Sequence, residues 1–398
     1  MKTKDIKPHI GIFGRRNNGK SSLINALCGH DIAIVSDTPG TTTDPVKKSV
    51  EIFGIGPAII VDTAGIDDTG ELGKKRIEKS MEVIKTVDLA VLLIADNNFD
   101  KYEEKLIAEF NRFDLNFIVV HNKSDIEPIN KITKEKINNL TSDFIEISIT
   151  QNNGIADLVE LLKNKMPDNV YLKPSLFADI VKPKDFVLLV TPIDSEAPEG
   201  RMILPQVMAI RDTLDKHGVC ILTRETELED FMNKGIRPDL VVTDSQAFDY
   251  VAKIIPREIP LTSFSILFSR LKGDFQTYLN GTSYLSKLND GDNVLILESC
   301  THHISCEDIG RYKLPEWISS FTGKKLNFDI VAGLSKIKGE PEDYSIVIQC
   351  GSCVVTRKQV LSRLKPFIEK KIPVTNYGMT IAYVNGIFDR VISPFKIK

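Results

Sequence analysis

The sequence has no strong excess of either charge. Its 51 lysine and arginine residues are offset by 54 aspartate and glutamate residues, so the formal net charge is -3 and the pI is about 6.1. Non-specific binding to nucleic acid requires a dense surplus of basic side chains that displaces counterions. The charge balance therefore argues against a nucleic-acid partner.

Long apolar runs are missing as well. No segment has the roughly 20 consecutive apolar residues that a helix needs to span a bilayer. The N-terminal sequence Met1-Lys2-Thr3-Lys4 leads into a strand-like stretch and does not have the apolar core of a signal peptide. We therefore expect a cytoplasmic protein without a membrane partner.

Cysteine is scarce, with six residues in 398. So few cysteines in a cytosolic chain of this size argue against a disulfide framework. Cys28 and Cys220 fall in apolar patterns, and we expect them to be buried. The other four cluster in the last quarter of the chain, and they are Cys300, Cys306, Cys350 and Cys353. This clustering calls for a functional explanation.

Short apolar runs alternate with helical patterns over residues 8–165, which is typical of a parallel sheet with helices on both faces. The expected strands are His9–Phe13, Ala58–Val61, Leu89–Ile94, Asn116–Val120 and Phe144–Ser148, with helices such as Lys20–Cys28 and Ile155–Lys163 between them. Pro167 interrupts this pattern. We expect a first domain over residues 1–168 and a linker over residues 169–176.

Two further alternating segments follow, at residues 177–263 and 264–398. The first of them is short for a core of its own, so we expect it to pair with a second copy. The expected strands are Phe186–Val190, Val219–Leu222, Leu240–Thr243, Asn293–Glu298, Tyr344–Gln349 and Pro373–Tyr377. The expected helices are Leu204–His217, Leu228–Lys234, Phe248–Ile255 and Thr356–Lys370. The fold class is α/β with three domains, the first with a mixed, mostly parallel sheet.

The segment from Gly14 to Ser21 has the pattern G-x-x-x-x-G-K-S between a strand and a helix, which is the context that a phosphate-binding P-loop requires. Its glycines let backbone N–H groups approach phosphates, Lys20 places its charge at the β- and γ-phosphates, and Ser21 is placed to bind Mg²⁺. The helix directs its positive end at the anion. The expected nucleotide-binding residues of this loop are Gly14, Asn17, Asn18, Gly19, Lys20, Ser21 and Ser22.

Two shorter motifs follow later strands. The first is Asp62–Gly65 (Asp-Thr-Ala-Gly), in which the Asp62 carboxylate can hold Mg²⁺ through water and the Gly65 N–H can reach the γ-phosphate. The second is Asn122–Asp125 (Asn-Lys-Ser-Asp), in which Asp125 can accept from N1–H and from the exocyclic amine of guanine. Adenine lacks that donor pair. The three motifs in this order predict a P-loop G domain that binds GTP and GDP and hydrolyses GTP.

These motifs resemble those of the translation-factor-related GTPases, in particular the tRNA-modification and ribosome-assembly branch. The resemblance implies that Gly40–Asp44 (Gly-Thr-Thr-Thr-Asp) is the switch I loop and that Thr42 closes over Mg²⁺ in the GTP state. It also implies that Ser148 and Ile149 contact the base. The expected catalytic residues are then Lys20, Thr42, Asp62 and Gly65.

Ile66 occupies the position at which Ras-like GTPases have a glutamine that orients water. Isoleucine cannot orient water, so intrinsic hydrolysis should be slow unless another group stabilises the transition-state charge. In relatives with asparagine at the position of Asn17, a potassium ion held by that side chain and by switch I carbonyls helps to fill this role. We infer that K⁺ stimulates hydrolysis; the alternative is that Asn17 is a simple turn residue.

The C-terminal cysteines follow expected strands. Cys300 comes after Asn293–Glu298, whereas Cys350 and Cys353 come after Tyr344–Gln349. In an open α/β sheet, ligands bind at the carboxyl ends of the strands. A helix N-terminus beside Cys353 is expected to favour thiolates.

Three kinds of site fit these cysteines. The first is an iron–sulfur cluster on Cys300, Cys350 and Cys353. The second is a zinc site that adds His302, and the third is a redox dithiol at Cys350 and Cys353 alone. Spacing does not separate cluster from zinc, and it favours the dithiol least. Cys306 is a weaker alternative ligand because it is offset from the strand end.

Over essentially its whole length, the chain resembles the HydF-type GTPases, the scaffold maturases of [FeFe]-hydrogenase. The resemblance rests on the order of a G domain, a middle α/β domain and a Cys-x-His segment followed far along the chain by Cys-x-x-Cys. Three further segments that match this family are Pro192–Arg201, Pro238–Phe248 and Thr375–Gly378.

This resemblance implies a [4Fe–4S] cluster on Cys300, Cys350 and Cys353, with one iron left for an exchangeable ligand that could be a di-iron precursor. His302 or Asp194 is the candidate fourth ligand. The middle domain is implied to form a homodimer. The implied partners are the [FeFe]-hydrogenase apoprotein and the radical-SAM hydrogenase maturases.

The leading hypothesis is therefore a GTPase scaffold that assembles or carries a metal cofactor, with Gly40–Asp44 and Gly65–Gly73 as the two switch loops. The alternative is an RNA-directed GTPase of the ribosome-assembly and tRNA-modification branch with a C-terminal zinc site. It requires a basic RNA-binding domain, which the charge balance does not support. A third possibility is a GTP-dependent redox sensor.

Overall fold

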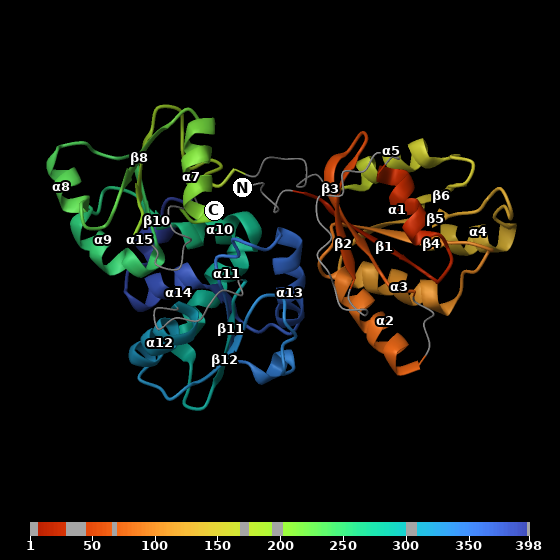
Figure 1. Ribbon diagram of the computed structural model, residues 1–398. Coiled ribbons are helices and arrows are strands. Elements are labelled where there is room, and N and C mark those ends of the chain that lie inside the picture. The colour runs from red at the N-terminus through yellow and green to blue at the C-terminus, as the bar shows by residue number, and fades with distance from the viewer. Residues whose placement is uncertain are drawn as a thin grey trace. The chain divides into compact units, whose positions relative to one another are not determined.

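The computed structural model describes residues 7–28, 45–65, 70–167, 175–192, 202–299 and 309–395, with the backbone alone for residues 70–76. The chain divides into two compact units, residues 1–173 and 174–398 (Figure 1). Both units are built of sheets and covering helices, which confirms the predicted α/β class. None of the helices in the described ranges combines the length and apolarity that a membrane crossing requires.

Six strands form the sheet of the first unit, and they are β1 (His9–Gly14), β2 (Val46–Ile52), β3 (Gly56–Asp62), β4 (Leu89–Ile94), β5 (Asn116–His121) and β6 (Phe144–Glu146). Their order across the sheet is β2-β3-β1-β4-β5-β6. Neighbours run parallel except β2 and β3, which are antiparallel. The sheet is thus mixed and mostly parallel, as predicted.

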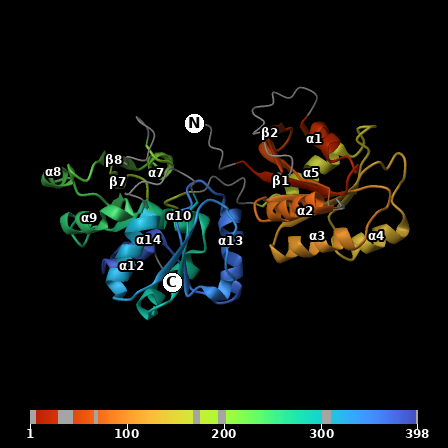
Figure 2. The same cartoon turned by 60° about the horizontal axis from the view of Figure 1, so that its bottom comes forward.

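Helices cover both faces of this sheet, and they are α1 (Lys20–Cys28), α2 (Gly70–Ile84), α3 (Lys101–Arg112), α4 (Lys131–Asn138) and α5 (Ile155–Lys165). One core contains apolar side chains of α1 and α5, and a second core contains those of α2, α3 and α4. Figure 2 shows the two groups of helices on opposite faces. Because both faces are covered, the central strands β1 and β4 are buried along their whole length.

The second unit has two four-stranded sheets, whose strands are β7 (Phe186–Val190), β8 (Val219–Thr223), β9 (Leu240–Thr243), β10 (Leu261–Ser263), β11 (Asn293–Leu297), β12 (Asn327–Val331), β13 (Ile346–Gln349) and β14 (Val374–Asn376). The strand orders are β10-β9-β7-β8 and β12-β11-β13-β14. All of these neighbours are parallel. Leu297 pairs with Gln349, so the carboxyl ends of β11 and β13 lie side by side.

The helices of the second unit are α7 (Leu204–Asp215), α8 (Leu228–Asn233), α9 (Phe248–Ile254), α10 (Phe264–Lys272), α11 (Phe275–Thr282), α12 (Leu314–Thr322), α13 (Arg357–Glu369), α14 (Tyr377–Val384) and α15 (Phe388–Ile392). One apolar core connects both sheets of this unit. Within it, α10 contacts α7, α13 and α14. Side chains at the end of α10 can therefore reach the loop between β13 and α13.

Candidate nucleotide site and cysteine site

The loop between β1 and α1 has a left-handed backbone at Gly14, Asn17 and Gly19, with φ angles of 146°, 63° and 96°. A Cβ at Gly14 would lie 2.3 Å from the backbone oxygen of Leu93, and a Cβ at Gly19 would lie 2.5 Å from the amide nitrogen of Asn122. Glycine is therefore required at both positions by the conformation and by the close approach of neighbouring atoms. Between them, Asn17 is exposed.

Lys20 begins α1 and directs its ammonium group back into the loop. Its Nζ donates to the carbonyl oxygens of Gly14, at 3.0 Å, and Arg15, at 2.8 Å. The neighbouring Ser21 hydroxyl donates to Oδ2 of Asp62 at 3.4 Å. The serine of the first motif and the aspartate of the second therefore meet at the end of β3. A hydroxyl and a carboxylate are oxygen ligands of the kind that Mg²⁺ prefers.

The surroundings of Asp62, at the end of β3, shift the pKa of its carboxyl group. Burial raises the pKa of Asp62, while the ammonium group of Lys20 and the hydrogen bond from Ser21 oppose that shift by favouring the carboxylate. The next residue, Thr63, is buried and donates to the carbonyl oxygen of Ile12 at 2.7 Å. This bond fixes the end of β3 against β1, next to the P-loop.

Asn122 connects the guanine motif to the P-loop. Its amide nitrogen donates to the carbonyl oxygen of Asn18 at 2.9 Å, and its Oδ1 accepts from the backbone N–H of Ile149 at 3.4 Å. The Asn18 amide in turn donates to the carbonyl oxygen of Leu93 at 2.8 Å. Lys123 follows in a left-handed conformation, with a φ of 62°. The predicted phosphate and base segments are therefore held together by buried amides.

Asp125 lies exposed beside the loop after β6. The Thr150 hydroxyl donates to its Oδ2 at 3.2 Å, and the Ser148 and Thr150 hydroxyls are 3.1 Å apart. Hydrogen bonding, chiefly from Ser148, lowers the pKa of Asp125. The side chain is therefore an oriented carboxylate that can only accept hydrogen bonds, as recognition of guanine requires. Contact of Ser148 and Ile149 with the base stays a prediction.

Part of the predicted nucleotide site lies outside the described residues. This applies to the switch I segment Gly40–Asp44 with Thr42, and to Ile66. Gly65 is described, and residues 66–69, which belong to the predicted second switch loop, are not. Ser22 is exposed in the first turn of α1.

Cys350 follows β13, and its sulfur lies where β13 meets β11. The Cys350 N–H donates to the carbonyl oxygen of Leu297 at 2.9 Å, which continues the pairing of the two strands. The sulfur accepts from the backbone N–H of Ser299 at 3.1 Å and of Ser352 at 3.4 Å. The thiol donates to the Ser299 hydroxyl oxygen at 3.0 Å. Ser299, at the end of the described segment, is therefore anchored to this sulfur.

Burial raises the pKa of the Cys350 thiol, and the hydrogen bonds from Ser299 and Ser352 oppose the shift. The loss of hydration raises the pKa of the Cys350 thiol by more than the N–H groups that face the sulfur lower it. Helix α13 begins at Arg357, after its N-cap Thr356. The expectation that this helix N-terminus favours a thiolate beside Cys353 stays a prediction.

Two cationic side chains brace the cysteine loop, residues 350–356, and the end of β11. Lys272, the last residue of α10, donates through Nζ to the carbonyl oxygens of Cys353, at 3.2 Å, and Val355, at 2.6 Å. Arg363 of α13 donates to the carbonyl oxygen of Glu298 at 2.9 Å. Both strand ends that carry the predicted ligands are thus tied to neighbouring helices.

Sequence reasoning missed several side chains of these sites. They are Thr150 beside Asp125 and, around the cysteine loop, Lys272, Ser299, Gln349 and Arg363. Ser299 and Gln349 carried one signal, because they stand directly before Cys300 and Cys350, and Thr150 directly follows Ser148 and Ile149. Lys272 and Arg363 carried none, because their contacts come from segments far apart in the sequence.

The other candidate cluster ligands lie outside the described residues, and they are Cys300, His302, Cys306 and Asp194. Among the residues that the structure describes, no group of three or more histidine, cysteine, aspartate or glutamate side chains is arranged to hold a metal ion. The ligand set therefore stays a prediction. Cys350 and Cys353 are its described members.

Three protein-family profiles match the chain. The hydrogen maturase F dimerization domain matches residues 176–273, and the hydrogen maturase F tetramerization domain matches residues 276–394. The 50S ribosome-binding GTPase family matches residues 9–123. The GTPase match covers the P-loop and the Asp62 motif and ends within the guanine motif.

Curated relatives resemble the first unit. The tRNA modification GTPase MnmE of Bacillus pumilus is 38% identical over 151 residues, which are 37% of this chain and 32% of that protein. MnmE of Clostridioides difficile is 38% identical over 157 residues, which are 38% of this chain and 33% of that protein. The chain thus spans about one third of the length of the curated relatives it matches.

Solved structures of G proteins are also similar. A variant of Aquifex aeolicus Era bound to GDP and AlF4⁻ has a TM-score of 0.34 at 18% identity and covers 62% of this chain and 97% of its own. The G domain of the T. maritima FeoB iron transporter has a TM-score of 0.32 at 20% identity and covers 40% of this chain and 98% of its own.

The family profiles agree with the order of domains inferred from the sequence. A GTPase domain comes first, and two domains specific to hydrogen maturase F follow and together cover more than half of the chain. The MnmE relatives, in contrast, match little more than the G domain. The chain therefore belongs to the hydrogen maturase F family, the HydF-type GTPases.

Proposed function

We propose that this chain is a GTP-hydrolysing scaffold that holds a [4Fe–4S] cluster on Cys300, Cys350 and Cys353. Its role is to carry the di-iron precursor of the H-cluster and deliver it to the [FeFe]-hydrogenase apoprotein. One observation carries the proposal. The sulfur of Cys350 accepts a hydrogen bond from the N–H of Ser299, and the Cys350 thiol donates one to the Ser299 hydroxyl. Ser299 is the residue directly before Cys300.

This contact matters because the cysteines come from distant parts of the sequence. Cys350 and Ser299 are 51 residues apart in sequence, yet β11 and β13 are adjacent and parallel. Consecutive Cα atoms are about 3.8 Å apart. A third ligand at Cys300 therefore requires only a local path of the chain, and this supports a shared centre for the three thiols.

The donors around the Cys350 sulfur fit a cluster ligand. Hydrogen bonds to cysteine sulfur are among the features that tune protein-bound iron–sulfur clusters, and Ser299 and Ser352 supply two backbone N–H groups here. Because burial raises the pKa of the Cys350 thiol, metal binding must displace its proton. The proposed cluster would supply one iron without a cysteine ligand, where cargo could be exchanged. His302 or Asp194 would occupy that position otherwise.

In the G domain, the hydrogen bonds of Lys20 and Ser21 support the roles proposed for the P-loop and for Asp62. Lys20 would contact the β- and γ-phosphates, and Ser21 with Asp62 would hold Mg²⁺ directly and through water. Thr42 and Gly65 would sense the γ-phosphate, and K⁺ at Asn17 would stabilise transition-state charge. Hydrolysis would act as a switch on partner affinity through the two switch loops, without supplying the chemistry of cluster synthesis.

A homodimer through the middle domain is part of the proposal. Among the described strands, β8 is at the edge of its sheet. Its apolar residues Val219 and Leu222 are 44% and 42% exposed, and on α7 Val207 and Leu214 are 48% and 55% exposed. An open edge strand with exposed apolar side chains is suited to pairing with a second copy. Radical-SAM hydrogenase maturases are the proposed partners that supply the precursor, in the cytoplasm.

Metal analysis combined with EPR tests the proposal. Anaerobically purified protein should contain about four iron ions per chain, and dithionite reduction should produce the EPR signal of a reduced [4Fe–4S] cluster. Zinc in place of iron, with no EPR signal, would overturn the scaffold function. It would instead favour the RNA-directed alternative, which at present lacks support because the tRNA modification relatives match little more than the G domain.

A further inference from the structure

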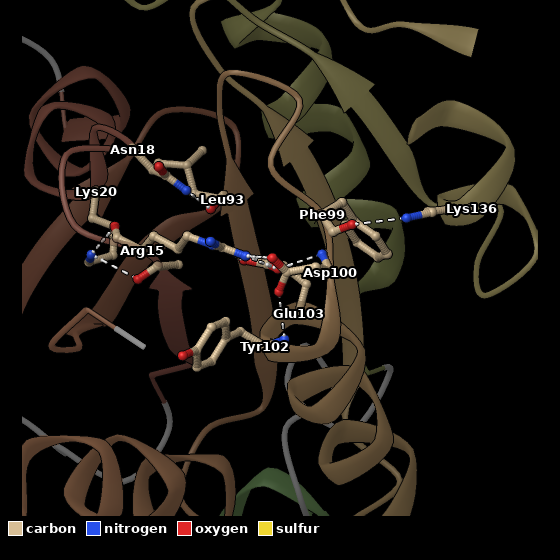
Figure 3. A network of polar contacts seen from close by, with 10 residues as sticks. Arg15, Asn18, Lys20, Leu93, Phe99, Asp100, Tyr102, Glu103 and Lys136 are labelled. Atoms are coloured by element: carbon tan, nitrogen blue, oxygen red, sulfur yellow. Dashed lines mark hydrogen bonds and ion pairs between the residues drawn. The ribbon is translucent and has the colours of Figure 1, made fainter. Parts of the chain in front are cut away.

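Arg15, the second residue of the P-loop, joins this loop to the first turn of α3 (Figure 3). Its guanidinium group forms a forked contact with Glu103, with Nε–Oε1 at 2.8 Å and Nη2–Oε2 at 2.9 Å. Nη2 also lies 2.8 Å from Oδ2 of Asp100. The Tyr102 ring is beside the guanidinium carbon, which lies 5.2 Å from the ring centroid.

Burial makes this contact rigid. The Glu103 side chain is 0% exposed and the Arg15 side chain is 16% exposed. A buried carboxylate is stable only when it is paired and hydrogen-bonded, and Glu103 also accepts the backbone N–H of Asp100 at 2.9 Å. Asp100 is the N-cap of α3, and this bond completes its capping box. The P-loop is therefore fixed to the beginning of α3.

The same loop is fixed at a second point. The Asn18 amide bonds to the carbonyl oxygen of Leu93 at the end of β4. Between the two anchors, Arg16 and Asn17 are exposed. The carbonyl oxygen of Arg15 accepts the hydrogen bond from Lys20. The side chain of Arg15 thus anchors the residue whose backbone holds the phosphate-binding lysine.

We propose that Arg15 is a positioning residue for nucleotide binding. Its ion pair with Glu103 holds the P-loop in the conformation that receives the phosphates. Nucleotide binding then costs less conformational entropy of the loop. The loop and Lys20 meet the phosphates in the ground state and in the transition state alike. The ion pair therefore strengthens the binding of GTP and GDP and leaves kcat unchanged.

The test replaces both charges by apolar side chains of similar size, in the double variant R15M with E103L. Neither charge is then left buried alone, so the fold should be retained. We expect the Kd of a fluorescent GDP analogue and the KM for GTP to rise about tenfold, with kcat at saturating GTP near its wild-type value. The thermal midpoint should fall modestly, because the double variant loses the capping-box bond to the Asp100 N–H. The variant Glu103→Gln keeps the size and one acceptor, and it should give a smaller rise.

Arg112→Met provides the matched control. It removes an exposed ion pair of the same helix, in which Arg112 lies 3.5 Å from Glu109, and it should change neither Kd nor KM. Wild-type Kd and KM in the double variant would overturn the proposal, because the pair would then stabilise only the fold. A fall in kcat at unchanged KM would also overturn it, because Arg15 would then act in the chemical step.

Discussion

His121 is the last residue of β5, directly before the guanine motif, and its side chain is fully buried. Its Nδ1 lies 3.8 Å from Oε2 of Glu146, which is too far for a hydrogen bond. Burial lowers the pKa of His121 below its usual value of 6.5, and Glu146 offsets this shift only in part. The folded protein therefore keeps this imidazole neutral at a pH where the unfolded chain binds a proton.

This difference gives stability a defined pH dependence. Below the unfolded pKa, the unfolded state binds more protons, so the free energy of unfolding falls as pH falls. We predict that His121→Gln makes the loss of stability between about pH 7 and pH 5 shallower in urea unfolding. The control is His217→Gln, which removes an exposed histidine. Identical pH profiles for wild type and His121→Gln would contradict the prediction.

Asn17 allows a test of the proposed potassium site. Its backbone is left-handed, with a φ of 63°, so Asn17→Gly removes the side chain without straining the loop. We predict that K⁺ accelerates GTP hydrolysis by the wild type about tenfold over Na⁺, which corresponds to about 1.4 kcal/mol in the barrier. Asn17→Gly should lose this difference. Equal rates of wild-type hydrolysis in K⁺ and Na⁺ would refute the proposed potassium site.

At the scale of elements, the β1–α1 loop depends on the end of β4. A side chain at Gly14 would meet the Leu93 carbonyl group in a conformation that residues other than glycine avoid. We predict that Gly14→Ala costs about 3 kcal/mol in the free energy of unfolding. Gly56→Ala is the control, since Gly56 has a φ of 96° but no atom within 4 Å of the added Cβ. Gly56→Ala should cost about 1 kcal/mol in the free energy of unfolding. Equal losses of stability in the two variants would contradict the prediction.

The elements that were predicted from the sequence are those with strong apolar patterns. Every expected strand and helix is present, with ends displaced by at most two residues. The strands that were missed are β2, β10 and β12. In β2, only Val50 and Ile52 are buried, and Lys47 and Lys48 interrupt the pattern. The β10 strand has only three residues, which is too short for a periodic signal.

The candidate sites were predictable to different degrees. Motif spacing was enough to place Lys20, Ser21 and Asp62 together, because each motif follows a strand of one parallel sheet. The pKa of Cys350 was not predictable, since it depends on burial that arises only when β11 and β13 pair. The ion pair between Arg15 and Glu103 also lacked a signal, because the two residues are 88 positions apart.

At the scale of the whole molecule, the two proposed activities belong to different units. The nucleotide motifs lie in residues 1–173 and the cysteine loop lies in residues 174–398. We predict that Lys20→Ala abolishes GTP hydrolysis, since it removes the charge at the phosphates, while the iron content stays at the wild-type level. Loss of iron in this variant would show that the cluster depends on the nucleotide site.

Three thiols from two strand ends are proposed to hold one iron-containing centre. Iron content per chain is measured in Cys300→Ser, Cys350→Ser and Cys353→Ser next to the control Cys220→Ser. Each of the three variants should lose the cluster and still hydrolyse GTP, whereas the control should keep both properties. Wild-type iron in all three variants would contradict the ligand assignment and leave only the guanine-nucleotide switch.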